Sequence, residues 1–308
     1  MRADEPPTST RATRRRRVDM ARTIGCGSAA LVCTLLATVS NEPVANARAD
    51  DASRAAVSAD PSAGCAAVAR PAAEAQPQRL TVGGEERTYV LDAPASQADR
   101  PLPIVLAFHG FRGTAENLRL GTGWGTRAAR DGFIAIHPDG HDGVRLLGSV
   151  GRGWDLGVQE TRDLDFVQAL VSRLERERCV DRRRIYATGM SNGAFFANLL
   201  GCKLADRLAA IAPVAGAMPL PACAPARPIP VLLIFGRADD IVPPAMMRSA
   251  RDWWAQVDRC GAPAERAGCD RYDDCAADVM SCEGAQAHAW PPRATEQIWQ
   301  FFQDHPRR

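Results

Sequence analysis

Three long apolar runs constrain the fold of this chain more than any other feature. They lie at residues 101–108, 209–216 and 229–236, and each offers apolar side chains on both sides of an extended strand. A strand that is apolar on both faces belongs inside a parallel sheet, because helices then cover it on both sides. Helical patterns separate the runs, so the sequence predicts an α/β fold with an open, mostly parallel central sheet and helices on both faces.

The remaining segments continue the same alternation of strands and helices. Two β-prone runs at 79–82 and 87–91 are split by Gly83 and Gly84, which indicates a hairpin. Further strands are expected at 132–136, at 185–188 and at 277–281, and helices at 115–130, 163–178, 245–257 and 294–302. The glycine-rich segment around 152–155 and the cysteine-rich segment after the 245–257 helix are expected to be loops.

A G-x-S-x-G sequence, Gly189-Met190-Ser191-Asn192-Gly193, lies between a strand and a helix-forming run. In this order of strand, tight turn and helix, the serine side chain projects from the edge of the sheet. The flanking glycines are needed because side chains at those positions would collide in such a turn. Ser191 is therefore a candidate nucleophile, although a G-x-S-x-G sequence also occurs by chance.

A serine nucleophile needs an imidazole to remove its proton and a carboxylate to orient that imidazole. Two histidines follow Ser191 in the chain: His288 stands in a loop after the last expected strand, and His305 lies beyond the last helix. The order serine, acid, histidine is typical of one large class of α/β enzymes. We predict that His288 is the base and that His305 is solvated.

The orienting acid is expected after the apolar run 229–236. Asp239 and Asp240 both lie there, at the edge of the sheet where open α/β folds bind ligands. One of the two should form a hydrogen bond with His288, and the other should cap the helix that begins nearby. Local sequence by itself leaves the choice between them open.

Two backbone N–H groups are expected to bind the negative charge that develops on a substrate oxygen. One is the amide of Asn192, at the positive end of the helix after Ser191. The other is the amide of Phe111, in the loop His109-Gly110-Phe111 that follows the first apolar run. His109 could be a metal ligand, but no carboxylate cluster adjoins it, so a structural role is favoured.

Four segments together resemble a known family: 189–193, His109-Gly110-Phe111, 236–239 with Val242-Pro243, and His288-Ala289-Trp290-Pro291. They are similar to the exported polyhydroxybutyrate depolymerase and feruloyl esterase group, which is related to carbohydrate esterase family 1 and has the α/β-hydrolase fold. The resemblance extends from Arg79 to Phe302. It implies a secreted serine esterase acting on hydroxycinnamate esters of plant cell-wall sugars or on short hydroxyalkanoate polyesters. It also favours Asp239 over Asp240 as the acid.

The chain departs from the family pattern near the expected site. Ala194 stands where the family has a second glycine, Gln286 and Ala287 replace part of a glycine-rich run before His288, and Pro292 replaces a glycine. These departures leave the triad intact and put the identity of the substrate in question. Trp154 and Trp290 are candidates for the wall of the substrate pocket, with ordinary packing at a loop edge as the alternative.

The N-terminal segment 1–47 has the features of a signal peptide. An arginine-rich start precedes an apolar run at 24–39 and the small-x-small sequence Ala45-Asn46-Ala47, so cleavage would leave Arg48 as the first residue. The apolar run is shorter than the ~20 residues needed to span a bilayer, so a stable membrane span is not expected. Residues 48–77 are polar and alanine-rich and are expected to be a disordered linker before the esterase domain at 78–308.

Cysteine usage agrees with export to an extracellular or periplasmic location. Eight cysteines follow the leader, and an even set in an exported protein indicates disulfide bonds. Cys202 and Cys223 bracket one helix-strand unit and the last four cysteines lie close together, so bridges within these groups would close short loops. A lipid-attachment role for Cys65 is the less favoured alternative. The spacing of the eight cysteines does not match a zinc site, so metal binding is not expected.

Composition excludes several other functions. The leader accounts for the excess of positive charge, because seven arginines oppose four acidic residues there and the formal charge of the whole chain is +2. The remainder has a net charge of −1, so nucleic-acid binding is not expected. No nucleotide-binding pattern follows the first strands, and no cofactor is expected.

Two alternatives to ester hydrolysis remain open: a non-catalytic polymer-binding relative, and an acyltransferase with the same triad.

Overall fold

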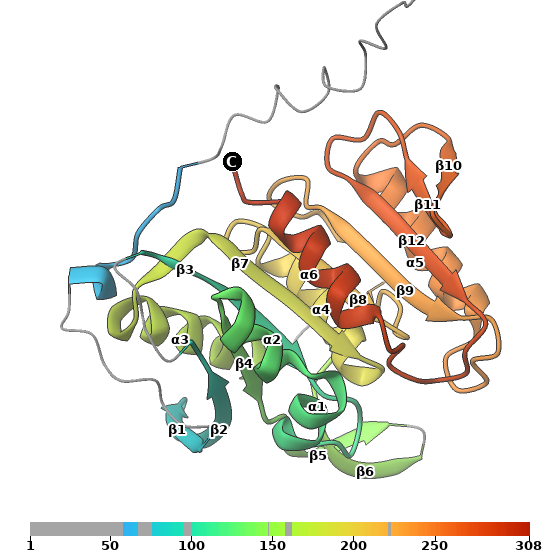
Figure 1. The fold of residues 1–308 in the computed structure, drawn as a ribbon. Helices are drawn as coiled ribbons and strands as arrows, with labels where there is room; N and C mark the ends of the chain where they lie inside the picture. Colours follow the sequence, from blue (N-terminus) through green and yellow to red (C-terminus); the bar gives the residue numbers. More distant parts are fainter. Residues whose placement is uncertain (1–57, 67–75, 95–99, 147, 158–161, 221–222) are drawn as a thin grey trace, which may run out of the picture. The chain divides into compact units, whose positions relative to one another are not determined.

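The computed structural model describes residues 58–66, 76–94, 100–146, 148–157, 162–220 and 223–308. Within these residues, ten strands form one sheet in the order β1-β2-β4-β3-β7-β8-β9-β12-β11-β10 (Figure 1). The strands are β1 (Pro77–Val82), β2 (Glu85–Asp92), β3 (Leu102–Phe108), β4 (Ile134–Pro138), β7 (Val180–Met190), β8 (Ala210–Val214), β9 (Val231–Gly236), β10 (Pro263–Arg266), β11 (Cys269–Tyr272) and β12 (Val279–Gly284).

The central part of this sheet is parallel, as the apolar runs predict. Strands β4, β3, β7, β8, β9 and β12 are paired in parallel. The two edges are antiparallel, because β2 pairs with β1 and β4 on one side and β11 pairs with β12 and β10 on the other. Parallel strands end on the same side, so the loops after β3, β7, β9 and β12 meet at one edge of the sheet.

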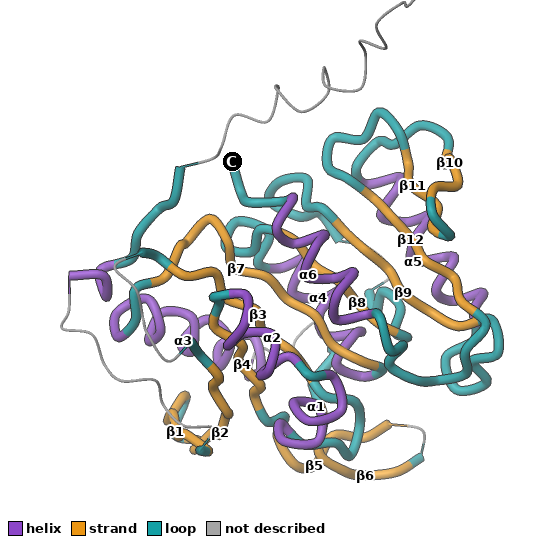
Figure 2. Tube along the Cα trace, in the orientation of Figure 1, coloured by secondary structure: helices purple, strands orange, loops and turns teal. Residues whose placement is uncertain are grey.

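Helices cover both faces of the sheet (Figure 2). They are α1 (Ala115–Thr122), α2 (Trp124–Asp131), α3 (Arg162–Glu177), α4 (Asn192–Lys203), α5 (Pro244–Val257) and α6 (Ala294–Asp304). One core contains side chains of α3, α4 and α5, such as Phe166, Phe196 and Trp254. The other contains side chains of α1, α2 and α6, such as Trp124 and Phe302. This confirms the α/β-hydrolase type of layered fold.

Three expected segments differ from the structure. The helix expected at 115–130 is two helices, because Gly123 adopts a left-handed conformation (φ 70°) and its N–H ends α1 on the Arg119 carbonyl. The glycine-rich segment expected to be a loop contains a hairpin of β5 (His141–Leu146) and β6 (Ser149–Gly153). The cysteine-rich loop contains β10 and β11. Both hairpins are rich in glycine or charged residues, so they lack the alternating apolar pattern from which a strand can be predicted.

Four disulfide bonds join the cysteines of the described segments. The bonds Cys202–Cys223, Cys260–Cys275 and Cys269–Cys282 lie within the two groups predicted from the sequence. The fourth bond joins Cys65 to Cys179, which removes the thiol that lipid attachment would need.

The segment 58–66 corrects the expected extent of the disordered linker. In addition to the Cys65 bond, the Ser62 hydroxyl donates a hydrogen bond to the Arg178 carbonyl (2.8 Å) and accepts one from the Val180 N–H (3.0 Å). Pro61 forms an isolated antiparallel bridge with Asp181. These contacts fix the segment beside the start of β7, so part of the expected linker is packed on the domain.

The expected signal peptide lies outside the described residues. In the part of the chain that the structure describes, no helix has the length and apolar character needed to cross a bilayer.

Asp258, at the C-terminal end of α5, should make the free energy of unfolding depend on pH. Its side chain is buried, and burial raises its pKa to about 7, against the smaller effects of the Ile229 N–H and Arg227. Because the folded pKa lies above the unfolded one, stability falls as pH rises from about 4 to about 7, by at most roughly 1.4 kcal/mol per pH unit. Asp258→Asn should therefore stabilise the protein at pH 8 and have little effect at pH 4.

Urea unfolding at several pH values checks this expectation. Asp206→Asn is the matched control, because Asp206 is exposed. A stability difference between the Asp258→Asn variant and the wild type that stays constant from pH 4 to pH 8 would contradict it.

Candidate active site

Ser191 occupies a strained turn between β7 and α4. Its backbone has φ 55° and ψ −122°, a combination that non-glycine residues rarely adopt. The Ser191 N–H donates a hydrogen bond to the Val214 carbonyl (3.0 Å), which ties the turn to the end of β8. A Cβ atom on Gly189 would overlap the Gly193 carbonyl, and one on Gly193 would overlap the Phe108 carbonyl. Both glycines of the G-x-S-x-G sequence are therefore required by close packing of the backbone.

The alanine that departs from the family pattern is accommodated by a neighbouring glycine. Ala194 is fully buried in the first turn of α4. A Cβ atom on Gly216, in the loop after β8, would lie only 2.6 Å from the Ala194 methyl carbon. The space for the extra methyl group is thus present, and the turn around Ser191 keeps its geometry.

Asp239 and His288 form a hydrogen-bonded pair at the carboxyl edge of the sheet. The His288 Nδ1 lies 2.8 Å from Asp239 Oδ2, and their side chains are only 12% and 1% exposed. The other carboxylate oxygen, Oδ1, accepts hydrogen bonds from the N–H groups of Ile241 (3.0 Å) and Val242 (2.8 Å). The Asp239 carboxylate is thereby held in one orientation, with one oxygen directed at the imidazole.

Asp240 has neither of the roles open to the second acid. It is exposed, and the described structure gives it no hydrogen bond to a histidine. The expectation that it caps the next helix is wrong: α5 is preceded by Pro243 and has no side-chain cap. A proline with its fixed φ begins this helix instead.

The loops that carry the acid and the histidine lie side by side because β9 and β12 are parallel neighbours. The Arg237 N–H donates to the Gly284 carbonyl (2.9 Å), and the Ala238 N–H donates to the Gln286 carbonyl (3.2 Å). A Cβ atom on Gly236 would overlap the Gln286 backbone. The Gln286 side chain lies over Gly284, because a Cβ atom on Gly284 would overlap Gln286 Oε1.

The loop 109–111 passes directly beside Ser191. A Cβ atom on Gly110 would lie 3.3 Å from the Ser191 Cβ and 3.9 Å from its Oγ. The Asn192 N–H is at the first position of α4, where an amide has no acceptor within the helix. The two amides expected to bind the oxyanion, those of Phe111 and Asn192, thus belong to segments that flank the serine side chain.

The side chain of Asn192 has a role that the sequence did not reveal. Its Oδ1 accepts a hydrogen bond from the Trp154 N–H (2.7 Å), and its Nδ2 donates one to the Trp154 carbonyl (3.2 Å). The two bonds attach the elbow to the segment after β6. No local pattern could connect residues 38 positions apart, so this contact is visible only in the folded chain.

The side chain of Trp154 packs in the core under the elbow. Its side chain is fully buried, stacks on Phe196 (ring centroids 5.0 Å apart) and contacts Phe108 edge-on. Trp154 also lines the hollow that adjoins Asn192, so its contribution to the wall of the substrate pocket stays a prediction. Trp290 is partly exposed, donates a hydrogen bond to Thr295 Oγ1 (3.0 Å) and stays a candidate for that wall.

One group of side chains in the described structure has the spacing of metal ligands. Ligand atoms of His141, Asp155 and Asp163 lie within 4.8 Å of one another. Arg87 Nη2 contacts Asp163 Oδ1 (2.7 Å), and Arg162 contacts Asp155 (3.3 Å), so the two carboxylates already face two cations. Burial raises the pKa of Asp163, and Arg87 opposes that effect. The group is therefore interpreted as an ion-pair network. It adjoins Trp154, whose backbone is bonded to the Asn192 side chain.

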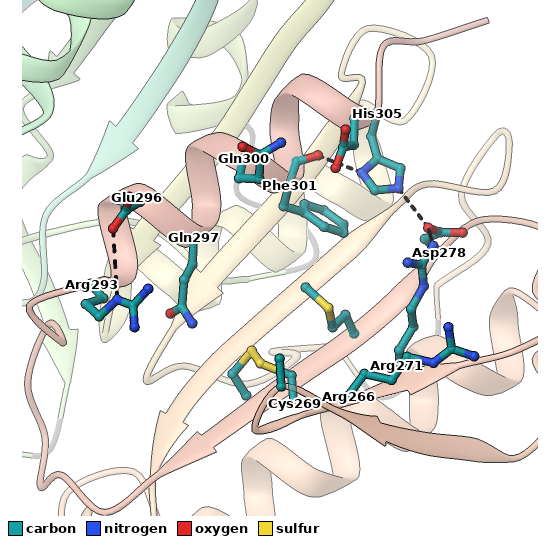
Figure 3. A pocket seen from close by; sticks show the side chains of 14 residues that line it. Arg266, Cys269, Arg271, Asp278, Arg293, Glu296, Gln297, Gln300, Phe301 and His305 are labelled. Carbon is teal, nitrogen blue, oxygen red and sulfur yellow. Dashed lines mark hydrogen bonds and ion pairs between the residues drawn. A yellow bond between two sulfur atoms is a disulfide. The ribbon is translucent and has the colours of Figure 1, made fainter. Parts of the chain in front are cut away.

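Two of the hollows on the described surface bear on the location of the site. One, of about 420 Å³, is lined by residues that include Arg145, Leu156 and Asn192, so it opens beside the elbow. The other, of about 380 Å³, lies between α6 and the strands β11 and β12 (Figure 3). Its lining contains none of Ser191, Asp239 and His288. Of these two, the first adjoins the candidate site.

His305 lines the second hollow and is not solvated as predicted. Its Nδ1 donates a hydrogen bond to the Phe301 carbonyl (2.6 Å), and its Nε2 lies 3.0 Å from Asp278 Oδ2 (Figure 3). The hydrogen bond from His305 lowers the pKa of Asp278, although burial opposes this. The last turn of α6 carries His305 back onto the start of β12, which its position near the chain end did not indicate.

Comparison with known proteins supports the resemblance seen in the sequence. The model of the family described as Esterase PHB depolymerase matches residues 87–253, more than half of the chain, and includes Ser191 and Asp239. Feruloyl esterase B of Piromyces equi is 29% identical over 207 residues, which cover 59% of this chain and 38% of that protein. The putative esterase NocK of Nocardia uniformis subsp. tsuyamanensis is 34% identical over 189 residues, covering 56% of this chain and 52% of that protein. The chain thus spans about half or less of these two relatives.

A solved structure shows the same fold at low sequence identity. The acetyl xylan esterase from Aspergillus awamori matches with a TM-score of 0.57 and 18% identity, over 74% of this chain and 99% of that one.

Proposed function

Because the chain belongs to the Esterase PHB depolymerase family, we propose that it is a secreted serine esterase that hydrolyses carboxylic esters through an acyl-serine intermediate. The observation that carries this proposal is the Asp239–His288 hydrogen bond at the same sheet edge as the strained Ser191 turn. A serine hydrolase uses a nucleophile, a base and an orienting acid for covalent catalysis, and these three residues supply them.

In the proposed first half-reaction, the Ser191 hydroxyl oxygen attacks the carbonyl carbon of the ester. His288 takes the hydroxyl proton on Nε2, since its Nδ1 faces Asp239. The carbonyl oxygen becomes an oxyanion, which the N–H groups of Phe111 and Asn192 bind. The tetrahedral intermediate then breaks its bond to the alcohol oxygen, and His288 returns the proton to the leaving alcohol.

In the second half-reaction, water replaces the alcohol. His288 removes a proton from the water as its oxygen attacks the acyl carbon, and the same two amides bind the new oxyanion. The bond to Ser191 Oγ then breaks and His288 returns the proton to that oxygen, which releases the acid and restores the serine. The side-chain clamp between Asn192 and Trp154 keeps the elbow amide in place through both steps.

The proposed substrates are hydroxycinnamoyl esters of cell-wall sugars or short polyhydroxyalkanoate esters. The name of the family and that of the Piromyces equi relative support these two classes. The hollow beside Asn192 supplies space for one side of such an ester. Four disulfide bonds support secretion, because such bonds persist in oxidising compartments.

Burst release of p-nitrophenol from p-nitrophenyl butyrate tests the proposal. We expect a rapid phase equal to the amount of enzyme followed by steady turnover, because acylation releases the phenol before water resolves the acyl-enzyme. A flat trace with folded protein would favour a non-catalytic binder. Turnover that requires an added alcohol acceptor would favour an acyltransferase. Rates on methyl ferulate and on a soluble hydroxybutyrate oligomer then separate the two substrate classes.

A further inference from the structure

His109 is buried at the end of β3, next to the loop that flanks Ser191. The side chain is 1% exposed, and both ring nitrogens have partners. The Gly140 N–H donates a hydrogen bond to His109 Nε2 (2.9 Å), so in the neutral ring the proton is on Nδ1. The Nδ1–H then donates to the carbonyl oxygen of Gly110 (2.8 Å). A metal-ligand role is excluded, since no ring nitrogen is free to bind one.

The hydrogen bond to Gly110 determines the direction of the following N–H group. The Gly110 carbonyl also accepts a hydrogen bond from the Gly113 N–H (2.9 Å). The described chain has no cis peptide bonds, and in a trans peptide the N–H points opposite to the C=O. With the Gly110 carbonyl directed at His109, the Phe111 N–H must point away from His109, in a loop whose Gly110 lies against the Ser191 side chain.

The imidazole is confined to this position. The Trp154 Nε1–H donates to the His109 carbonyl (2.9 Å), and the two rings are in contact with centroids 5.2 Å apart. A Cβ atom on Gly113 would lie 2.9 Å from the Gly110 oxygen and 3.2 Å from His109 Nδ1. Burial lowers the pKa of His109, which keeps the ring in the neutral form that this pattern of bonds requires.

We propose that His109 is a positioning residue for the oxyanion site. Its Nδ1–H holds the Gly110 carbonyl and thereby directs the Phe111 N–H at the substrate oxyanion that forms when Ser191 attacks the ester. This inference rests on the proposed esterase function. His109 touches no reacting atom, and its effect passes through one peptide unit. Among the described residues the Phe111 N–H has no backbone acceptor of its own, so it is available for a substrate oxygen.

Two substitutions separate this role from a general structural one. In His109→Asn the amide nitrogen can take the place of Nδ1 and keep the bond to the Gly110 carbonyl. In His109→Gln the longer side chain reaches the place of Nε2 and keeps only the bond from Gly140. If His109 directs the Phe111 amide, His109→Gln should lower kcat for p-nitrophenyl butyrate by roughly 10- to 100-fold, since loss of an oxyanion donor costs about 10²- to 10³-fold.

The split between binding and turnover gives a second readout. For His109→Gln we expect KM to stay within about twofold, because the oxyanion contact is made only in the transition state. Affinity for butylboronic acid, which forms a tetrahedral adduct with the serine, should fall in parallel with kcat/KM. His109→Asn should keep kcat within about fivefold of the wild type. Equal losses in the two variants, or a greater loss in His109→Asn, would overturn the inference.

Glycine variants keep the test decisive if a histidine variant fails to fold. Gly113→Ala places a methyl group against the Gly110 oxygen and His109 Nδ1 without touching Gly140, so the same selective loss of kcat is expected. Gly121→Ala is the matched control, because nothing lies within 4 Å of the added carbon. If the wild type itself does not hydrolyse the ester, the proposed function fails. If the wild type is active and Gly113→Ala is equally active, the positioning role alone fails.

Discussion

Replacement of Ser191 by alanine is expected to lower kcat for p-nitrophenyl butyrate by roughly 10⁴- to 10⁶-fold, the loss seen when a triad nucleophile is removed in other serine hydrolases. The reason is that no acyl-enzyme can form without the hydroxyl oxygen. Ser191 has φ 55° and alanine also carries a Cβ atom, so we expect the substitution to leave the strain of the turn unchanged. KM for the ester should change little, because the two oxyanion amides and the pocket remain.

Ser249→Ala provides the matched control for this experiment. Ser249 is exposed on α5, and its hydroxyl donates only to the Ala245 carbonyl one turn earlier. That variant should keep wild-type kcat. Labelling by a fluorophosphonate should disappear in Ser191→Ala and persist in Ser249→Ala. Labelling that survives the loss of Ser191 would show that another residue is the nucleophile.

The second large effect is expected at Asp239. Asp239→Asn should lower kcat by about 10⁴-fold, the magnitude found when the orienting acid of a serine protease is replaced by its amide. The local bonds explain why the amide cannot substitute. The N–H groups of Ile241 and Val242 require an acceptor, so the asparagine oxygen should stay with them and its NH₂ group should face His288. Nδ1 would then have to accept, which moves the imidazole proton to Nε2, where Ser191 needs a base.

Asp240→Asn is the control for the neighbouring acid. Asp240 is exposed and does not contact His288, so kcat should remain within about twofold of the wild type. A rise in pH only removes the proton of the imidazolium, so it should not restore the activity of Asp239→Asn, whose defect is in the tautomer of the neutral imidazole. Full activity of Asp239→Asn together with a large loss in Asp240→Asn would reverse the assignment of the acid.

The central sheet could be predicted because its strands are apolar on both faces. The runs at 101–108 and 229–236 became β3 and β9, fully buried along their length. The antiparallel hairpins at β5–β6 and β10–β11 could not, because their residues are glycine-rich or charged and their pairing depends on neighbours. The two-helix arrangement of 115–131 depends on one left-handed glycine, a conformation that composition permits but does not require.

The candidate site shows the same division. A G-x-S-x-G turn with an acid and a histidine after it could be recognised as an ordered set, and the structure joins the acid to the histidine by a hydrogen bond. The solvated position predicted for His305 was wrong, and the core packing of Trp154 could not be predicted, because each depends on burial against segments that are distant in the chain. Trp154 fills the core under the elbow, and His305 folds back onto Asp278.

The sequence by itself determined which chemical groups are present and in what order the strands deliver them to one edge of the sheet. Local spacing carries that information, because strand, turn and helix each have a short period. Only the tertiary structure decided between Asp239 and Asp240 on geometry, attached the Asn192 side chain to Trp154, and directed the Gly110 carbonyl at His109. Each of these depends on hydrogen-bond directions between backbone and side-chain groups, which are defined only when separate segments pack together.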